Sequence, residues 1–459
     1  MFLRTVETKC GKIEGQPAAD PRITAFKGIP FAKPPVGDLR FHAPVPVEKW
    51  EGTLNAYKFA PIAVQPTPYY DPNDLYCREW SVDRDQPMSE DCLYLNVWTP
   101  AKEANEKLPV YVWIYGGGWQ TGFTAEMEFD GERMARRGIV VVSLCYRLNM
   151  FGFMSHPEIT AENPEEPGNF GLLDQRMAMQ WVKDNIEAFG GDSNNITIGG
   201  QSAGGGSVLC QIAKGTEGKN GEKLYNRAIV HSGLFYSPDG SFFRQKTLTE
   251  AEQCGVDFFN FCGVKSLAEI RKLDTDTLRK KWDEYGGFQK SIATWTPIRD
   301  EKFVKVDFLD GIKNGTVPPV PLMIGHTTDE FLAQNEKGET IRPLAIAVEK
   351  YQEMCEEKKY SVPNYYYVFD VPIPGWDNPG TFHSVDLWFW FESLAKCWRP
   401  FKGVHYDVSR QMCNYLCNFV KNGNPNGKDS DDTELPQWNA YTSSSKEKML
   451  FQKDCKLVK

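Results

Sequence analysis

The sequence predicts an α/β fold in which helices cover both faces of a central, mostly parallel twisted sheet. Apolar runs of strand length recur along the 459 residues, and amphipathic helical patterns lie between several of them. Strands buried on both faces read as nearly continuous hydrophobic runs, and their alternation with helices is typical of parallel sheets. Since no internal repeat or low-complexity tract divides the chain, we expect residues 1–459 to form a single domain.

The predicted strands are, in order, residues 108–115, 138–145, 195–198, 227–231, 320–324 and 365–371. Apolar residues at helical spacing predict two helices. One has an apolar face that runs from Leu172 to Ile186, and the other has one that runs from Val408 to Phe419. In parallel sheets ligands bind at the carboxyl ends of the strands. We therefore expect the functional site in the segments that follow these strands.

Composition and charge exclude several classes of protein. Hydrophobic residues make up 41% of the chain and charged residues 25%, which is ordinary for a globular protein. The chain carries 52 basic and 61 acidic residues, a formal net charge of −9, and the acidic residues are scattered. No basic stripe indicates a nucleic-acid partner, and the longest apolar runs are far too short for a membrane span.

Cysteine usage bears on the compartment. The twelve cysteines show no framework spacing, and residues 1–5 lead straight into a polar, alternating strand pattern without an apolar leader segment. We therefore expect a cytoplasmic protein whose cysteines are thiols. Cys413 and Cys417 lie one helical turn apart but lack a second ligand pair. They are interpreted as buried thiols, so we expect neither a metal nor a cofactor.

Residues 199–204 (GGQSAG) are the most informative stretch of the chain. They follow the apolar run 195–198 and precede a helix start, which is the setting of a nucleophile elbow. A serine on so sharp a turn has strained backbone geometry, and side chains two residues away would collide with it. Gly200 and Gly204 stand at those positions. Ser202 is thus the candidate nucleophile.

Acyl transfer through a serine also needs hydrogen-bond donors for the oxyanion that develops. Residues 115–119 (YGGGW) come directly after the strand at 108–115. Consecutive glycines allow bare backbone N–H groups to converge on one point. We therefore expect an oxyanion hole made of the N–H groups of Gly117, Gly118 and Ala203.

The general base must be one of six histidines. His42 and His156 are interpreted as structural, and His231 as a residue that packs under the site. His326 shares a loop with two carboxylates, and His405 lies at the start of the last long amphipathic helix. His383 lies in a loop just past the strand at 365–371, where a base reaches the elbow with the chain order Ser, acid, His. His383 is therefore the candidate base. The loop at 325–331 (GHTTDEF) supplies the acid, and from local sequence either Asp329 or Glu330 fits.

Aromatic residues gather near these motifs and give candidates for an apolar substrate pocket. We expect Trp119, Phe235 and Trp388 to contribute to it, although core packing explains any single one equally well. Three further aromatics belong to the same cluster: Tyr236, Phe389 and Trp390.

Taken with the elbow, three further motifs make the chain similar to the type-B carboxylesterases. These are residues 26–41, with FKGIPFA, PPVG and LRF, residues 90–97 (EDCLYLNV), and residues 190–192 (GGD). The type-B carboxylesterases have the α/β-hydrolase fold, and the family also includes cholinesterases and some fungal lipases. The resemblance extends from the strands at 5–15 to an expected last strand near 446–451, which is essentially the whole chain.

The resemblance implies a serine carboxylesterase that acts on small-molecule esters, with short-to-medium acyl or aromatic groups. It assigns the acid to Glu330, because the family's G-x-x-x-D-E sequence ends there, and leaves Asp329 as the fallback. The triad would then be Ser202, Glu330 and His383. It also implies two buried ion pairs, Arg40–Glu90 and Arg147–Asp174.

The chain departs from the family pattern at several positions. Tyr115 replaces a histidine before the glycines, so we expect a different anchoring of that loop. Cys77 and Cys92 match a cysteine pair that is bridged in exported relatives, and we expect thiols here. Cys262 lacks its usual partner, because Glu269 stands in that position. The interval from residue 330 to 383 is shorter than in cholinesterases, which favours a more open pocket.

Two alternative functions stay open at the level of sequence. A lipase would need an apolar lid, and the loop at 78–85 is too charged to make a good one. A non-catalytic, cholinesterase-like binding protein would not need the intact set Ser202, Glu330 and His383.

Overall fold

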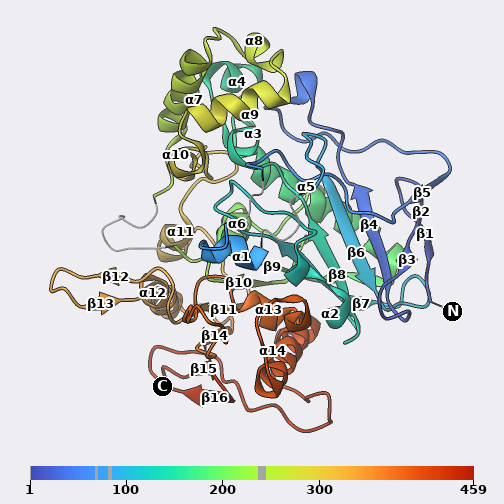
Figure 1. The fold of residues 1–459 in the computed structure, drawn as a ribbon, viewed down its shortest axis with the longest axis vertical. Helices are drawn as coiled ribbons and strands as arrows, with labels where there is room; N and C mark the ends of the chain where they lie inside the picture. Colours follow the sequence, from blue (N-terminus) through green and yellow to red (C-terminus); the bar gives the residue numbers. More distant parts are fainter. Residues whose placement is uncertain (1, 68–70, 81–84, 236–243) are drawn as a thin grey trace.

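The computed structural model describes residues 2–67, 71–80, 85–235 and 244–459. Eleven of its strands form one large sheet (Figure 1). They are β3 (Gln16–Pro17), β4 (Thr24–Pro30), β6 (Tyr94–Thr99), β7 (Leu108–Ile114), β8 (Val140–Leu144), β9 (Gly191–Gln201), β10 (Arg227–His231), β11 (Leu322–Thr327), β14 (Asn364–Phe369), β15 (Lys448–Phe451) and β16 (Cys455–Val458). Their spatial order is β16-β15-β14-β11-β10-β9-β7-β8-β6-β4-β3.

The centre of this sheet is parallel, from β8 through β7, β9, β10, β11 and β14 to β15. Antiparallel strands close both edges, with β6, β4 and β3 on one side and β16 on the other. Helices surround it, as expected for strands that are buried on both faces. The structure thus confirms the predicted α/β fold and mostly parallel sheet.

Helices pack on both the sheet and one another. They are α1 (Leu75–Trp80), α2 (Glu132–Ala135), α3 (Asn149–Phe153), α4 (Pro157–Glu162), α5 (Phe170–Asn185), α6 (Ala203–Lys214), α7 (Leu248–Cys262), α8 (Leu267–Arg271), α9 (Thr275–Glu284), α10 (Gly287–Thr294), α11 (Phe308–Asn314), α12 (Pro343–Glu357), α13 (Leu387–Trp390) and α14 (Gly403–Asn422). In the sheet region α6 packs on β9 and β10, α12 on β11, and α14 on β7 and β9. Helices α4 and α7 to α9 gather at one end of the molecule, at the top of Figure 1.

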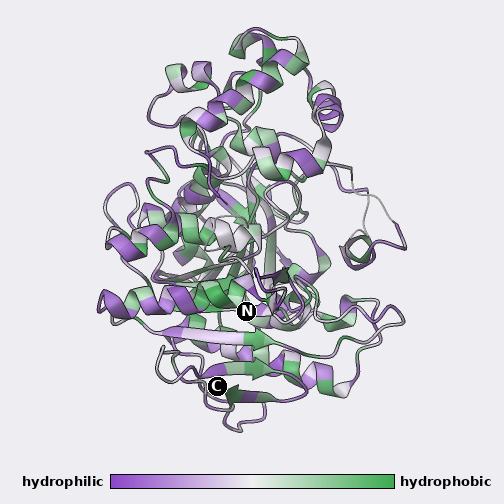
Figure 2. Ribbon diagram, turned by 90° about the vertical axis from the view of Figure 1, so that its left-hand side faces the viewer, coloured by the Kyte–Doolittle hydropathy of each residue, from purple (hydrophilic) through white to green (hydrophobic). Residues whose placement is uncertain are grey.

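Smaller elements complete the fold. Strands β1 (Thr5–Glu7), β2 (Lys12–Glu14) and β5 (Thr53–Asn55) make a separate sheet, and β12 (Ala333–Gln334) pairs with β13 (Thr340–Ile341). Short 3₁₀ turns are η1 (Gly37–Leu39), η2 (Met127–Phe129), η3 (Ile186–Phe189) and η4 (Leu394–Lys396). Figure 2 shows hydrophobic strands at the centre, whereas the outer helices alternate hydrophobic and hydrophilic stretches. Among the described residues, no helix is long and apolar enough to cross a membrane.

Strand boundaries differ from the predicted ones where proline or a short hairpin intervenes. Strand β11 begins at Leu322, because Pro321 has no N–H to give to the ladder. The predicted last strand is β15, but the chain turns back and adds β16 antiparallel to it. The expectation that the chain's strands end near residue 451 was therefore wrong.

The register of the parallel strands positions the site. Gly200 on β9 is level with Ile114 on β7 and with Val230 on β10. His231 at the end of β10 is in turn level with Gly325 on β11. The loops that leave β7, β9, β10 and β11 therefore emerge at the same edge of the sheet, which brings together motifs more than 200 residues apart.

Two buried ion pairs join segments that are distant in sequence, and the family resemblance implied both of them. The Arg147 guanidinium donates to both Asp174 carboxylate oxygens, at 2.8 and 2.6 Å, and their side chains are 4% and 0% exposed. Arg40 makes a similar two-pronged contact with Glu90, at 2.7 and 2.6 Å. Both predicted pairs are thus confirmed.

We expect Asp174→Asn to lower the free energy of unfolding by about 3–5 kcal/mol, because it leaves the buried Arg147 charge without its carboxylate. Asp184→Asn is the matched control: its partner Lys9 is 68% exposed, and exposed pairs contribute about 0–1 kcal/mol. Urea unfolding of both variants measures the difference. Equal losses in the two variants would contradict the structural role of the Arg147–Asp174 pair.

Candidate active site

Ser202 lies on a sharp turn between β9 and α6. Its backbone has φ 55° and ψ −125°, a conformation that non-glycine residues rarely adopt. A Cβ on Gly200 would lie 2.4 Å from the Gly204 carbonyl oxygen, and one on Gly204 would lie 2.1 Å from the Ile114 carbonyl oxygen. Both glycines are therefore required for the turn, for the steric reason that the sequence suggested.

The glycine-rich loop after β7 comes close to this serine. A Cβ on Gly116 would lie 3.0 Å from Ser202 Cβ. Gly117 and Gly118 have φ of 98° and 64°, which favour glycine, and within the described residues their N–H groups have no protein acceptor. Ala203 is the first residue of α6, so its N–H has no acceptor within the helix either. The three N–H groups are thus unused donors in the loop and helix that flank Ser202.

Tyr115 anchors the glycine loop. Its ring stacks on Tyr146 with centroids 4.6 Å apart, its hydroxyl lies 3.3 Å from the Tyr146 carbonyl, and the Tyr146 hydroxyl donates to the Tyr115 carbonyl at 2.9 Å. Burial raises the pKa of both phenols, which therefore remain neutral donors. This reciprocal pair is the different anchoring that the Tyr115 departure led us to expect.

Glu330 and His383 form the acid–imidazole pair of the site. Glu330 Oε2 is hydrogen-bonded to His383 Nδ1. Its other oxygen, Oε1, accepts from the Ser232 hydroxyl and from the Thr327 N–H, both at 2.7 Å. The Glu330 side chain is 1% exposed and that of His383 is 13% exposed. The carboxylate is thus fixed on both oxygens, and it fixes the imidazole in turn.

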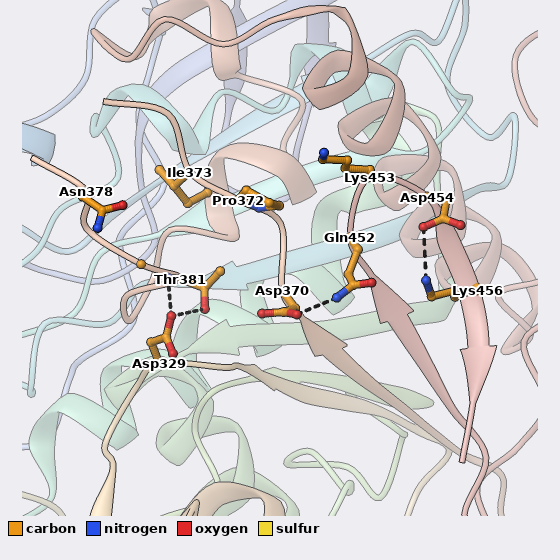
Figure 3. Close-up of a pocket in the computed structure, with 11 residues that line it drawn as sticks. Asp329, Asp370, Pro372, Ile373, Asn378, Thr381, Gln452, Lys453, Asp454 and Lys456 are labelled. Carbon is orange, nitrogen blue, oxygen red and sulfur yellow. Dashed lines mark hydrogen bonds and ion pairs between the residues drawn. The ribbon is translucent and has the colours of Figure 1, made fainter. Parts of the chain in front are cut away.

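Asp329, the alternative acid, faces the other way. Its Oδ2 accepts from the N–H and the hydroxyl of Thr381, at 2.8 and 3.0 Å. Figure 3 shows this contact at the edge of an open polar cavity of about 520 Å³, which Asp370 and Gln452 also line. None of the three predicted triad residues lines that cavity. The structure therefore decides which of two adjacent carboxylates reaches the imidazole.

The second imidazole nitrogen meets a residue that the sequence did not single out. Among the described residues, His383 Nε2 is hydrogen-bonded to Gln201 Nε2, at 3.2 Å, rather than to the Ser202 hydroxyl. The same amide donates to the Ser384 hydroxyl at 2.6 Å. Because the amide donates, Nε2 is the acceptor and Nδ1 carries the proton toward Glu330. Gln201 therefore selects the tautomer in which Nε2 is able to accept a proton.

We expect Gln201→Glu to move the acid limb of the kcat/KM pH profile upward by about one pH unit, because a carboxylate beside the imidazole stabilises its protonated, inactive form. The profile of p-nitrophenyl butyrate hydrolysis measures the shift. Gln201→Met, which removes the amide without adding charge, serves as the control. An acid limb that stays in place in Gln201→Glu would contradict this role of Gln201.

The other histidines are held by structural contacts. His231 is fully buried below the site, where its Nδ1 bonds the Tyr367 hydroxyl at 2.7 Å, and burial lowers its pKa to about 3. Tyr367 in turn donates to Asp386, whose pKa burial and the nearby Glu330 raise to about 7. His326, His156, His405 and His42 bond backbone or tyrosine groups away from Ser202. These contacts agree with the interpretation of His42 and His156 as structural and of His231 as packing under the site.

Three aromatic rings contact one another in a row that extends from the glycine-rich loop to the His383 imidazole. Trp119 meets Phe235 edge-on at 6.3 Å, Phe235 meets Phe331 at 5.9 Å, and Phe331 lies 4.4 Å from the His383 ring. Trp119 and Phe235, both predicted to bind substrate, line a small cavity of about 40 Å³ beside α6. Trp388, the third predicted residue, is fully buried in α13 and lines none of the described cavities.

The remaining cluster aromatics belong to the core or lie outside the described part of the chain. Phe389 packs on Phe369, and Trp390 packs on Tyr367 and Phe451. Tyr236 lies outside the described residues. Phe331 was not predicted, although its position directly after Glu330 was the available signal. Ser232 was likewise missed, although it follows His231 at the end of a predicted strand.

A strained serine on a β9–α6 elbow, a buried carboxylate–imidazole pair and a glycine-rich donor loop define a serine hydrolase of the α/β-hydrolase fold. The chain belongs to the carboxylesterase family, whose sequence profile matches residues 3–343 and 339–458. It is accordingly a serine carboxylesterase that hydrolyses esters, as its esterase relatives also indicate.

The relatives include bacterial esterases and cholinesterases. Para-nitrobenzyl esterase of Bacillus subtilis (strain 168) is 30% identical over 500 residues, which cover 99% of this chain and 96% of that protein. Acetylcholinesterase of Bungarus fasciatus is 40% identical over 512 residues, which cover 96% and 81%. A solved PNB esterase structure superposes with a TM-score of 0.81 at 27% identity, covering 99% of this chain and 97% of that one. The solved structure of carboxylesterase EST55 of Geobacillus stearothermophilus superposes with a TM-score of 0.80 at 26% identity, and it also covers 99% of this chain and 97% of that one.

All twelve cysteines lie in the described residues, and all are free. Cys77 and Cys92, the pair that is bridged in exported relatives, are buried thiols, and burial raises the pKa of Cys92 well above its usual value. Cys413 and Cys417 are both buried in α14. Thiols at these positions stay a prediction, and the buried, unbridged cysteines of the structure agree with it.

Proposed function

We propose that this carboxylesterase acts on small esters with short-to-medium acyl or aromatic groups, with Ser202 as nucleophile, His383 as base and Glu330 as the acid that orients it. The observation that carries the assignment is the buried contact of Glu330 Oε2 with His383 Nδ1, close to the Ser202 elbow. The apolar rings of Trp119 and Phe235 beside a small cavity support a substrate of limited size.

The proposed reaction has two steps. His383 Nε2 first changes its hydrogen-bond partner from the Gln201 amide to the Ser202 hydroxyl. It then takes the hydroxyl proton as Ser202 Oγ attacks the ester carbonyl. The N–H groups of Gly117, Gly118 and Ala203 stabilise the oxyanion, and the imidazolium then protonates the leaving alcohol. Water repeats the sequence on the acyl-serine. Glu330, which is already held on Oε1, stabilises the imidazolium throughout without taking the proton.

Two measurements test this function together. Purified protein should hydrolyse p-nitrophenyl butyrate faster than p-nitrophenyl palmitate, and one equivalent of diisopropyl fluorophosphate should abolish the activity and add mass to the peptide that contains Ser202. A preference for palmitate would favour the lipase alternative. Absence of both hydrolysis and labelling would favour a non-catalytic, cholinesterase-like binding protein.

We also propose that the protein acts in the cytoplasm as a single domain. The free state of all twelve cysteines supports a reducing compartment. Fractionation of the source cells with an antibody against the chain tests the location, and recovery in the exported fraction would contradict it.

A further inference from the structure

The cavity beside α6 has apolar walls and a polar far end. Trp119, Gly206 and Phe235 line its near end, and Leu209 and Phe308 contribute apolar walls. Cys210 lies farther from Ser202 along α6 than Gly206 does, and Gln245, which contacts Cys210, lines the cavity together with Asp307. The cavity's volume of about 40 Å³ exceeds the 10–15 Å³ that one water-sized group needs. The cavity therefore has room for the small group at the end of a chain.

The cavity lies on the oxyanion side of Ser202. Trp119 directly follows Gly118, and Gly206 lies one turn of α6 beyond the serine. No residue of the His383 loop lines the cavity, whereas the leaving alcohol must lie against His383 to be protonated. The acyl half of the substrate is thus the half that this cavity fits.

Gln245 is an unsatisfied polar group at the far end. It is only 8% exposed, and its Nε2 donates to Cys210 Sγ at 3.5 Å. Among the described residues, Gln245 Oε1 has no hydrogen-bond partner. Burial raises the pKa of the Cys210 thiol to about 12, so that sulfur carries no charge. A buried amide oxygen without a donor is unfavourable, and a ligand hydroxyl that donates to it would remove that cost.

Asp307 adds a second polar group at this end. Its Oδ1 caps α11 by accepting from the Leu309 N–H at 3.0 Å. Burial raises the pKa of this carboxyl, which disfavours the anion and suits a neutral ligand group. A hydroxyl has one proton to donate and lone pairs to accept, so it is able to donate to Gln245 Oε1 while it accepts from the protonated form of Asp307.

We propose that the cavity is an acyl subsite that binds the terminal hydroxyl of an ω-hydroxyacyl ester through Gln245 Oε1. The inference rests on the proposed function. Cys210, next to Gln245, is eight residues from Ser202 along α6, a rise of about 12 Å. After the ester bond and the hydrogen bond are allowed for, an extended chain of about eight carbons spans this distance.

The test compares p-nitrophenyl 8-hydroxyoctanoate with p-nitrophenyl octanoate in wild-type protein and in Gln245→Leu. The kcat/KM for the hydroxylated ester divided by that for the plain octanoate should fall about tenfold in Gln245→Leu, because leucine offers no acceptor to the hydroxyl. Gln352→Leu is the matched control: Gln352 is also 8% exposed but lies on α12, so the ratio should remain at the wild-type value. An unchanged ratio in folded Gln245→Leu overturns the proposal.

A second comparison needs no variant. In wild-type protein, the preference for the hydroxylated ester should appear at eight carbons and vanish between p-nitrophenyl 3-hydroxypropanoate and p-nitrophenyl propanoate, whose chains are too short to reach Gln245. An equal hydroxyl preference at both lengths, or at neither, overturns the subsite. Failure to hydrolyse any of the four esters contradicts the proposed function itself and is thereby distinguished from failure of the subsite.

Discussion

Ser202→Ala is expected to lower kcat for p-nitrophenyl butyrate by about 10⁶-fold, the scale of loss when a nucleophile is removed from a serine triad. Alanine keeps the Cβ and the backbone of the elbow, so the unusual φ and ψ at this position are no harder to adopt. The Ser202 N–H still donates to the His231 carbonyl, at 2.9 Å in the wild-type structure. The loss is therefore chemical rather than structural.

Initial rates of purified wild-type and variant protein measure this effect, with thermal unfolding as the check on folding. Ser193→Ala is the control, because Ser193 lies on the same strand β9 at the end remote from the elbow. It should retain near wild-type activity. If Ser202→Ala kept more than a small fraction of the activity, another group would have to be the nucleophile.

Glu330→Gln is expected to give the second largest effect, a fall in kcat of about 10³–10⁴-fold. The amide keeps the shape of the side chain but carries no charge to stabilise the imidazolium. The amide has only one acceptor oxygen. If that oxygen keeps the Ser232 hydroxyl and the Thr327 N–H as its donors, the NH₂ group faces His383 Nδ1, where the carboxylate was the acceptor. The imidazole would lose both its orientation and its preferred tautomer.

Asp329→Asn is the control for this prediction, since it changes the neighbouring carboxylate in the same way. Asp329 binds Thr381 and faces the cavity of Figure 3, so kcat should change by less than about tenfold. Steady-state kinetics with KM and kcat resolved would separate the two variants. A larger loss in Asp329→Asn than in Glu330→Gln would reverse the assignment of the acid.

The sequence by itself predicted the fold and the residue types of the site, because both depend on local constraints. A hydrophobic run of strand length and a glycine that avoids a collision are encoded within a few residues. For that reason the sequence was enough to predict the elbow around Ser202 and the glycine-rich loop at Gly117 and Gly118. The buried pairs Arg40–Glu90 and Arg147–Asp174 and the choice of Glu330 came from family resemblance instead.

Only the tertiary structure decided which groups meet across long stretches of chain. Asp329 and Glu330 are adjacent in sequence, yet one faces Thr381 and the other His383, because both lie in the turn after β11, where their side chains point to different partners. The contacts of Gln201 with His383 and of Gln245 with Cys210 also join distant segments. Such contacts follow from strand register and helix packing, which no local pattern specifies.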